Sequence, residues 1–211
     1  MTGLPDRAAF YLGELTIRIV VSAHIDSRKD SPGALDNASG VAVLLCLAEL
    51  LTEYEGVPTV ELVPFNGEDY YAAPGQKEWL KSNEGRLGDI IFGINIDDAG
   101  LRNWDTHVSF SGVSERLKTV ALKTVQSRDG FEEGPEWFQG DHAILAMRGV
   151  PVMAIASAGM YEFMERYAHS KRDTVDLADY DKIADIALYV RDVIERVAAT
   201  SMEAEHARKS G

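Results

Sequence analysis

Apolar runs of strand length recur along the chain and alternate with longer stretches of helical periodicity. The runs that predict buried strands are residues 16–23, 59–65, 89–97, 106–110 and 150–156. The stretches that predict helices are residues 37–54, 76–83, 115–126, 141–147, 161–167 and 180–203. Nearly continuous apolar strands suit the interior of a sheet, and helices between strands provide crossovers for parallel neighbours. The pattern therefore predicts a three-layer α/β/α sandwich with a mostly parallel, mixed central sheet.

The segments between these elements are predicted to be loops or chain ends. Residues 8–12 form either a short helix or a short strand, and residues 128–140 and 169–179 form polar loops. Pro64 cannot donate to a ladder, so we place it at the end of its strand. No repeat and no linker composition interrupts the chain, so residues 1–211 are expected to form a single domain whose polar tail frays after the last helix.

Composition narrows the class of protein. A length of 211 residues with 26% charged and 45% hydrophobic residues suits one globular domain. The formal net charge of -13 argues against nucleic-acid binding, which needs clustered Lys and Arg. No apolar run approaches the roughly 20 residues of a membrane span and the N-terminus lacks a secretory leader, so we expect a cytoplasmic protein with no membrane partner. The single Cys46 lies in an apolar helical pattern, which predicts a buried, inert thiol.

Side chains that can carry chemistry gather where the apolar runs stop. His24 and Asp26 end the first run, and strand alternation puts both on the same face. The others follow later strands or lie in the loops beyond: Asp36, Glu68, Asp69, Asp97 and His169. Ligands of open α/β sheets gather at the carboxyl ends of the strands. Two histidines and three carboxylates can hold a pair of divalent ions with one carboxylate bridging, and such nitrogen–oxygen sets suit zinc, with cobalt or manganese as alternatives.

Each of these residues alone has a simpler explanation. A single Asp36 before a helix is more often a cap than a ligand, and His169 would more often be a surface histidine. Five such motifs occur in one order along the chain, each at a predicted strand end or in the loop that follows it. Together they favour a functional site. A pair of metal ions can polarise a carbonyl and activate water. Glu68, next to the candidate ligand Asp69, would then act as the general base.

Taken together, the motifs resemble the di-zinc exopeptidases of metallopeptidase family twenty-eight, which includes bacterial aminopeptidases, glutamate carboxypeptidases and glutaminyl cyclases. The resemblance covers nearly the whole chain from about residue 16. The motifs that carry it are Ala-His24-Ile-Asp26-Ser, Gly-Ala-Leu-Asp36-Asn-Ala-Ser-Gly, Phe-Asn-Gly-Glu68-Asp69, Asn-Ile-Asp97, Gly140-Asp141-His142 and His169-Ser-Lys-Arg-Asp173-Thr.

The resemblance implies two zinc ions and assigns their ligands. His24 and Asp97 would bind one ion, and Asp69 and His169 would bind the other. Asp36 would bridge the two ions.

The resemblance also implies the roles of the residues around the ligands. Asp26 would orient His24, and Glu68 would carry a proton from the activated water to the leaving amine. The peptide bond between Asp36 and Asn37 would be cis, as it often is in this family.

The chain departs from the family pattern at several positions. Asp69 stands where the family usually has a second Glu, which would change metal spacing or affinity. Ala168 stands where many of the aminopeptidases have a Tyr that donates to the oxyanion, so the oxyanion donor is unassigned. Ile144 and Leu145 replace the Pro-Phe of the family's side-chain pocket. We do not expect the family's leading helix and strands before residue 16, so the expected fold is N-terminally shortened. An open sheet edge there would favour a homo-oligomer, or the chain would be part of a longer protein.

The expected activity is that of an aminopeptidase acting on peptide or aminoacyl substrates. The acidic cluster would attract the free α-amine of the substrate. The residues expected to bind the substrate or to line its side-chain pocket are Trp137, Phe138, Asp141, His142, Ile144 and Met147. Core or loop packing is the alternative explanation for the apolar members of this set.

Three other functions stay open at this point. A carboxypeptidase would need a cation for the terminal carboxylate, and Arg148, Lys171 and Arg172 are candidates. A glutaminyl cyclase would use one zinc ion, and a non-catalytic scaffold domain would have lost ligands, so the nearly complete ligand set argues against both. Neither a Gly-x-Ser-x-Gly elbow nor a phosphate-binding loop occurs in the sequence.

Overall fold

The computed structural model describes residues 10–12, 17–71 and 73–209, and within them the strands form one mixed sheet. Its spatial order is β1 (Phe10–Leu12), β3 (Thr59–Phe65), β2 (Arg18–His24), β4 (Ile90–Ile96), β7 (Val152–Ser157), β5 (Thr106–Ser111) and β6 (Phe131–Glu133). The four central strands β3, β2, β4 and β7 are parallel, whereas β1 runs antiparallel to β3, and β5 runs antiparallel to β7 and parallel to β6. The predicted three-layer fold with a mostly parallel, mixed sheet is confirmed.

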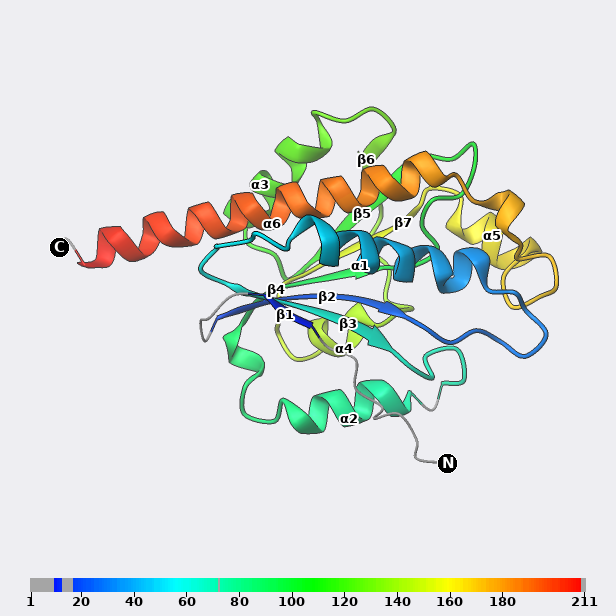
Figure 1. Cartoon of the computed structure of the whole chain (residues 1–211), viewed down its shortest axis with the longest axis horizontal. Helices are drawn as coiled ribbons and strands as arrows, with labels where there is room; N and C mark the ends of the chain where they lie inside the picture. Colours follow the sequence, from blue (N-terminus) through cyan, green and yellow to red (C-terminus); the bar gives the residue numbers. More distant parts are fainter. Residues whose placement is uncertain (1–9, 13–16, 72, 210–211) are drawn as a thin grey trace.

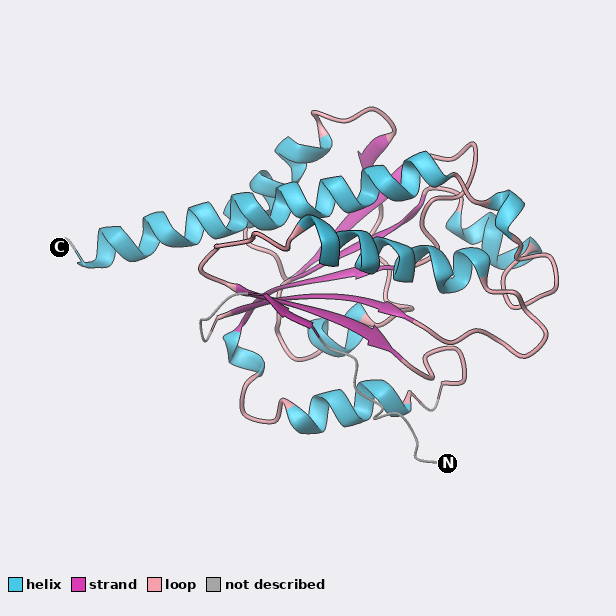
Figure 2. Cartoon of the chain, viewed as in Figure 1, coloured by secondary structure: helices cyan, strands magenta, loops and turns pink. Residues whose placement is uncertain are grey.

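Helices cover both faces of the sheet (Figures 1 and 2). One face packs against α1 (Ser39–Leu50), α3 (Glu115–Val125) and α6 (Tyr180–Lys209), and the larger core lies between them. The other face packs against α2 (Pro74–Ser82) and α4 (His142–Ala146). The short helix α5 (Met160–Arg166) lies near the carboxyl ends of the central strands. Among the described residues, no helix has the length and apolar composition that crossing a bilayer requires.

The predicted elements differ from the observed ones mainly at their ends. Of the segment 8–12, residues 10–12 form the short strand β1, and residues 8 and 9 lie outside the described residues. Strand β1 pairs with residues 60–62 of the sheet edge that we expected to be open. The segment expected to be a loop between residues 128 and 140 contains the short strand β6. Pro64 lies beyond the part of β3 that pairs with β1, so its missing N–H interrupts no pairing on that side. Helix α6 continues to Lys209, past the predicted end at residue 203.

The expectation that Cys46 is buried is wrong. Its side chain is exposed on α1, and Leu45 beside it is 64% exposed. Helix α1 is apolar nearly all round, so the sequence pattern does not distinguish the face toward the sheet from the outer face. The face that enters the core carries Val43, Leu44 and Leu47.

A buried ion pair joins the sheet to α2 on the side away from α6. The guanidinium of Arg18, only 2% exposed, donates from Nη1 to Glu61 Oε2 at 2.8 Å and to Asn83 Oδ1 at 2.7 Å. The indole N–H of Trp79 donates to the other carboxylate oxygen of Glu61 at 2.8 Å. Breaking such a pair leaves an uncompensated buried charge, which is costly.

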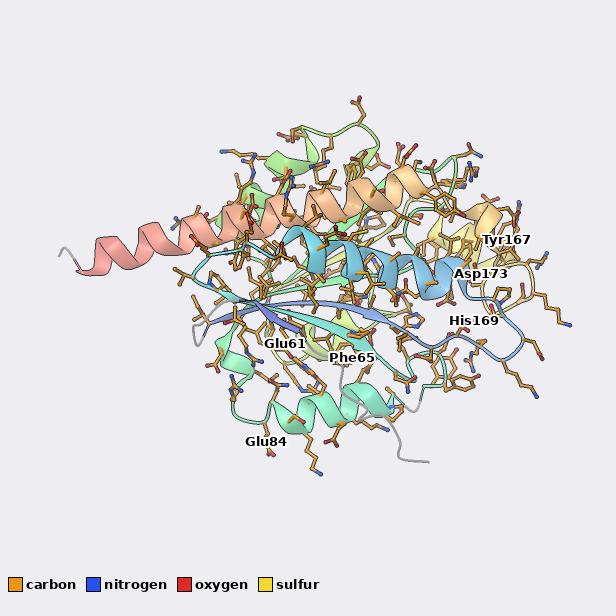
Figure 3. All side chains as sticks on the ribbon, viewed as in Figure 1. Glu61, Phe65, Glu84, Tyr167, His169 and Asp173 are labelled. Atoms are coloured by element: carbon orange, nitrogen blue, oxygen red, sulfur yellow. The ribbon has the colours of Figure 1, made fainter. Side chains whose placement is uncertain are left out.

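We therefore expect Glu61→Gln to lower the free energy of unfolding by about 3 kcal/mol, because it leaves the buried charge of Arg18 unbalanced. Urea denaturation measures the change. Glu84→Gln is the matched control: Glu84 is exposed near the end of α2 (Figure 3), and its loss should change stability by less than about 0.5 kcal/mol. Equal, small effects in the two variants would contradict a stabilising role for the pair.

Candidate metal centre

The candidate ligands meet at the carboxyl end of the parallel strands. His24 is the last residue of β2, Asp69 follows β3, and Asp97 follows β4 directly. Asp36 comes from the irregular turn η1 (Ala34–Ala38) before α1. His169 comes from the loop after α5 and is labelled at this end of the molecule in Figure 3. Since parallel strands end at the same edge of a sheet, side chains far apart in sequence converge there.

The carboxylate of Asp36 is shared by two groups of side chains. Its Oδ1 lies 3.0 Å from Nε2 of His24, which also lies 3.3 Å from Asp97 Oδ1. Its Oδ2 lies 3.1 Å from Nε2 of His169, which also lies 2.8 Å from Asp69 Oδ1. Each oxygen of Asp36 thus belongs to a separate histidine–carboxylate cluster. This arrangement is the one a bridging carboxylate between two cations requires.

Hydrogen bonds to the main chain of η1 hold Asp36 in place. The fully buried carboxylate of Asp173 accepts from the backbone N–H of Leu35 at 2.9 Å and of Asp36 at 3.2 Å. The amide of Asn37 donates to the carbonyl of Ile96 at 2.9 Å, which ties the turn to the end of β4. The peptide bond between Asp36 and Asn37 is cis, so that prediction is confirmed.

Two glycines allow the elements to approach closely around this cluster. A Cβ on Gly40 would lie 2.7 Å from the carbonyl oxygen of Ile96, so only glycine lets α1 begin directly against β4. A Cβ on Gly140 would lie 3.2 Å from Oδ2 of Asp97, and its φ of 151° is one that L side chains rarely adopt. A side chain at position 40 would push α1 away from β4, whereas a side chain at position 140 would crowd Asp97.

Asp26 orients His24 through its main chain rather than through its carboxylate. Nδ1 of His24 donates to the backbone carbonyl of Asp26 at 3.0 Å, while the nearer carboxylate oxygen is 3.8 Å away. In the neutral ring this bond keeps the proton on Nδ1, so Nε2 carries the lone pair on the side of Asp36 and Asp97. The carboxylate of Asp26 instead accepts from the N–H groups of Gly67 and Glu68, at 2.6 and 3.1 Å. One residue therefore positions both the histidine and the turn that carries Glu68.

The pKa values describe a strongly negative site. Burial lowers the pKa of His24, but Asp97 and then Asp36 outweigh burial and raise that pKa well above its usual value. Burial, followed by the negative charge of Asp97, raises the pKa of Glu68 to about 7. Burial and Asp36 together raise the pKa of Asp69 to about 6, although both histidines oppose the shift. The cluster therefore favours any added positive charge.

The ligand atoms of the two histidine–carboxylate clusters fit divalent cations. Asp69 Oδ2 is buried and has no hydrogen-bond partner within the described part of the chain, although unpaired buried oxygens are costly. Arg28 comes no closer than 3.9 Å to Asp69 through its Nε, and its guanidinium lies over the rings of Tyr70 and Tyr71. One imidazole nitrogen and shared carboxylate oxygens at each cluster form a ligand set that suits zinc.

A cavity of about 320 Å³ opens onto these side chains. Acidic residues and the two histidines line one part, and apolar side chains line the rest. Its lining consists of His24, Asp36, Glu68, Asp69, Tyr71, Asp97, Asp98, Trp137, Gln139, Met160, Tyr161, Met164 and His169. This volume lies at the lower end of the range of about 300–1,000 Å³ that is typical of small-molecule pockets.

Of the residues expected to bind substrate, only Trp137 lines this cavity. Ile144 packs in the core beneath the sheet, because the helix α4 that carries it faces Val20 and Val152. Phe138 and Met147 are 56% and 74% exposed and do not line the cavity.

Asp141 and His142 are buried behind the wall of the cavity. The amide of Gln76 donates to Asp141, and His142 donates from Nε2 to the carbonyl of Trp137 at 2.7 Å. Burial lowers the pKa of His142, which keeps the ring neutral. His142 therefore helps to position Trp137, and neither Asp141 nor His142 lines the cavity.

The wall formed by α5 was not predicted from the sequence. Met160 and Met164 are four residues apart on this helix, so both face the cavity, and Tyr161 lies beside them. Their helical spacing is visible in the sequence. The proximity of α5 to the strand ends is not, because it depends on the path of the loops.

Comparisons with known proteins agree with this geometry. Residues 13–194 match the family model described as Peptidase family M28. A vacuolar membrane protease of Leptosphaeria maculans is 29% identical over 161 residues, which cover 70% of this chain and 19% of that protein. A probable zinc metalloprotease of Pyrenophora tritici-repentis is 32% identical over 98 residues, which cover 40% of this chain and 20% of that protein.

Solved structures with this fold include several aminopeptidases. The aminopeptidase from Aneurinibacillus sp. strain AM-1 aligns with a TM-score of 0.73 at 23% identity, over 86% of this chain and 44% of that one. The zinc aminopeptidase BSAP of Bacillus subtilis aligns with a TM-score of 0.74 at 20% identity, over 86% and 46%. The chain thus spans about half of these structures and about a fifth of the two fungal proteins. Because the family model matches most of its length, the chain belongs to peptidase family M28.

Proposed function

We propose that the chain is the catalytic domain of a two-metal aminopeptidase. The observation that carries the proposal is the division of the Asp36 carboxylate between His24 and His169, since two clusters that share one acid can hold two ions side by side. The ligands would be His24, Asp36 and Asp97 for one ion and His169, Asp36 and Asp69 for the other. Two zinc ions so held would polarise the scissile carbonyl and activate water.

Glu68 is the proposed general base. It lines the cavity beside both clusters, and its backbone N–H is anchored on Asp26. Its pKa of about 7 suits a group that accepts a proton from water and returns it to the leaving amine near neutral pH.

The walls of the cavity support an aminopeptidase. Glu68 lines the cavity and belongs to neither ligand set, so its negative charge would attract the α-ammonium group of a substrate and repel a terminal carboxylate. Trp137, Met160 and Met164 offer an apolar surface for the first side chain.

A carboxypeptidase is the second candidate, because Arg28 is a cation close to the cluster. Its guanidinium lies 4.6 Å from the ring centre of Tyr71, a residue that lines the cavity. Arg148 donates to the carbonyl of Ile144, and Arg172 lies over Tyr167. Arg28 is therefore better placed to meet a carboxylate than Arg148 or Arg172.

Metal analysis and substrate blocking test the proposal together. We expect two zinc ions per chain, hydrolysis of aminoacyl-naphthylamides and of dipeptide amides, and no hydrolysis of N-acetylated dipeptides. Cleavage of N-acetylated dipeptides but not of dipeptide amides would support the carboxypeptidase instead. A stoichiometry of one ion would favour a glutaminyl cyclase, and a chain that binds metal and hydrolyses none of these compounds would favour a scaffold domain.

The first side chain of the substrate should be apolar. We expect kcat/KM for leucyl- or methionyl-naphthylamide to exceed that for the aspartyl compound by at least about 100-fold. Met160, Met164 and Trp137 offer no positive charge to pair with the carboxylate of an aspartyl substrate. Steady-state kinetics measure the ratio. Equal rates would show that α5 does not contact the substrate.

A further inference from the structure

Asp98 is a buried carboxylate that the proposed ligand set does not use. It is 7% exposed and lines the cavity. Its Oδ1 is buried without a hydrogen-bond partner in the described part of the structure. Buried carboxylate oxygens are normally hydrogen-bonded or bound to a cation, so this atom requires a ligand.

The position of Asp98 points to the nature of that ligand. One oxygen each from Asp36, Asp97 and Asp98 lies within 4.8 Å of the other two. Asp36 and Asp97 are also the two carboxylates that contact Nε2 of His24. The chain turns at Asp98 with a φ of 51°, and both Asp97 and Asp98 line the cavity instead of pointing to opposite faces as they would in a continuing strand.

We propose that Asp98 is a further protein ligand of the cation held by His24, Asp36 and Asp97. The inference rests on the two-metal function proposed above. It gives the two metal sites different numbers of carboxylate ligands. The site with Asp98 has one nitrogen and three carboxylates, whereas the site at His169 has one nitrogen and two. More carboxylate oxygens favour harder cations, so the first site accepts Mn²⁺ more readily than the second. Across both sites, four carboxylates balance the charge of two divalent ions: those of Asp36, Asp69, Asp97 and Asp98.

Asp98→Asn tests this with a substitution that the backbone tolerates, since Asn is among the residues that adopt positive φ. Isothermal titration of the metal-depleted full chain with Zn²⁺ and with Mn²⁺ gives the affinity of each site. We expect the variant to lose more than about 100-fold in affinity at one site, above the 10–100-fold typical of residues that only support a ligand. The second site should change by less than about tenfold, and the loss should be larger for Mn²⁺ than for Zn²⁺.

Asp141→Asn is the matched control. Asp141 is equally buried, also has an unpartnered oxygen, and also interacts electrostatically with Asp97, but it does not line the cavity. Its variant should keep both affinities within about tenfold of the wild type, and Asp97→Asn should lose the same site as Asp98→Asn.

The outcomes separate this inference from the function on which it rests. Two zinc ions in the wild type and unchanged affinities in Asp98→Asn would overturn the inference alone. It would also be overturned if Asp98→Asn and Asp141→Asn lost affinity equally, or if Asp98→Asn raised only the KM for substrates with a free amine. A wild-type chain that binds no zinc would overturn both.

Discussion

Replacing Glu68 by Gln should leave two metal ions bound and lower kcat by about 10²–10⁴-fold. Gln has nearly the same shape and its backbone N–H can still donate to Asp26, so the turn that carries it is expected to keep its position. The amide cannot accept a proton from water, and that is the step assigned to Glu68. Metal analysis and steady-state kinetics on the same preparation measure the two quantities.

The matched control for this variant is Glu162→Gln. Glu162 lies on α5, pairs with Arg166 at 2.7 Å and does not line the cavity, so the same chemical change there should leave kcat unchanged. Wild-type turnover in Glu68→Gln would remove Glu68 from the mechanism. Loss of a metal ion in that variant would instead identify Glu68 as a ligand.

Replacing Asp36 by Asn should weaken both metal sites at once. Its two oxygens lie 3.0 Å from His24 Nε2 and 3.1 Å from His169 Nε2, and Asn retains only one acceptor oxygen. We expect the affinity to fall by more than about 100-fold at each site, with turnover lost in parallel. Titration with Zn²⁺ measures both affinities.

Asp69→Asn provides the comparison, because the histidine nitrogen that Asp69 Oδ1 contacts, at 2.8 Å, is Nε2 of His169. It should weaken one site and leave the other close to the wild type. If Asp36→Asn also weakened only one site, Asp36 would not bridge the two ions. Circular dichroism should show both variants folded, because Asn can keep the packing of either buried side chain.

The positions of the candidate ligands follow from the sequence for a physical reason. His24 and Asp97 stand at the ends of apolar runs that match β2 and β4 closely, and parallel strands bring such ends to one edge. The position of Asp36 depends instead on the irregular turn before α1, whose cis bond only the family resemblance predicted.

The walls of the cavity could not be predicted in the same way. The sequence places the apolar residues Phe138 and Met147 in the side-chain pocket, but the path of the loops decides which apolar side chains face the cavity. Ile144 shows the same limit, because the apolar face of α4 is needed for the core beneath the sheet. The role found for the carbonyl of Asp26 is invisible in a sequence, since every residue has a carbonyl.

The apolar wall and the acidic cluster belong to different parts of the molecule, and this has an evolutionary consequence. The acids stand on strand ends fixed by the sheet, whereas Met160 and Met164 stand on the short helix α5, which few core residues anchor. With the proposed function, changes in α5 would alter which peptides are accepted and would leave the acidic cluster on the strand ends unchanged. Relatives of this chain could diversify their substrates through a single seven-residue helix.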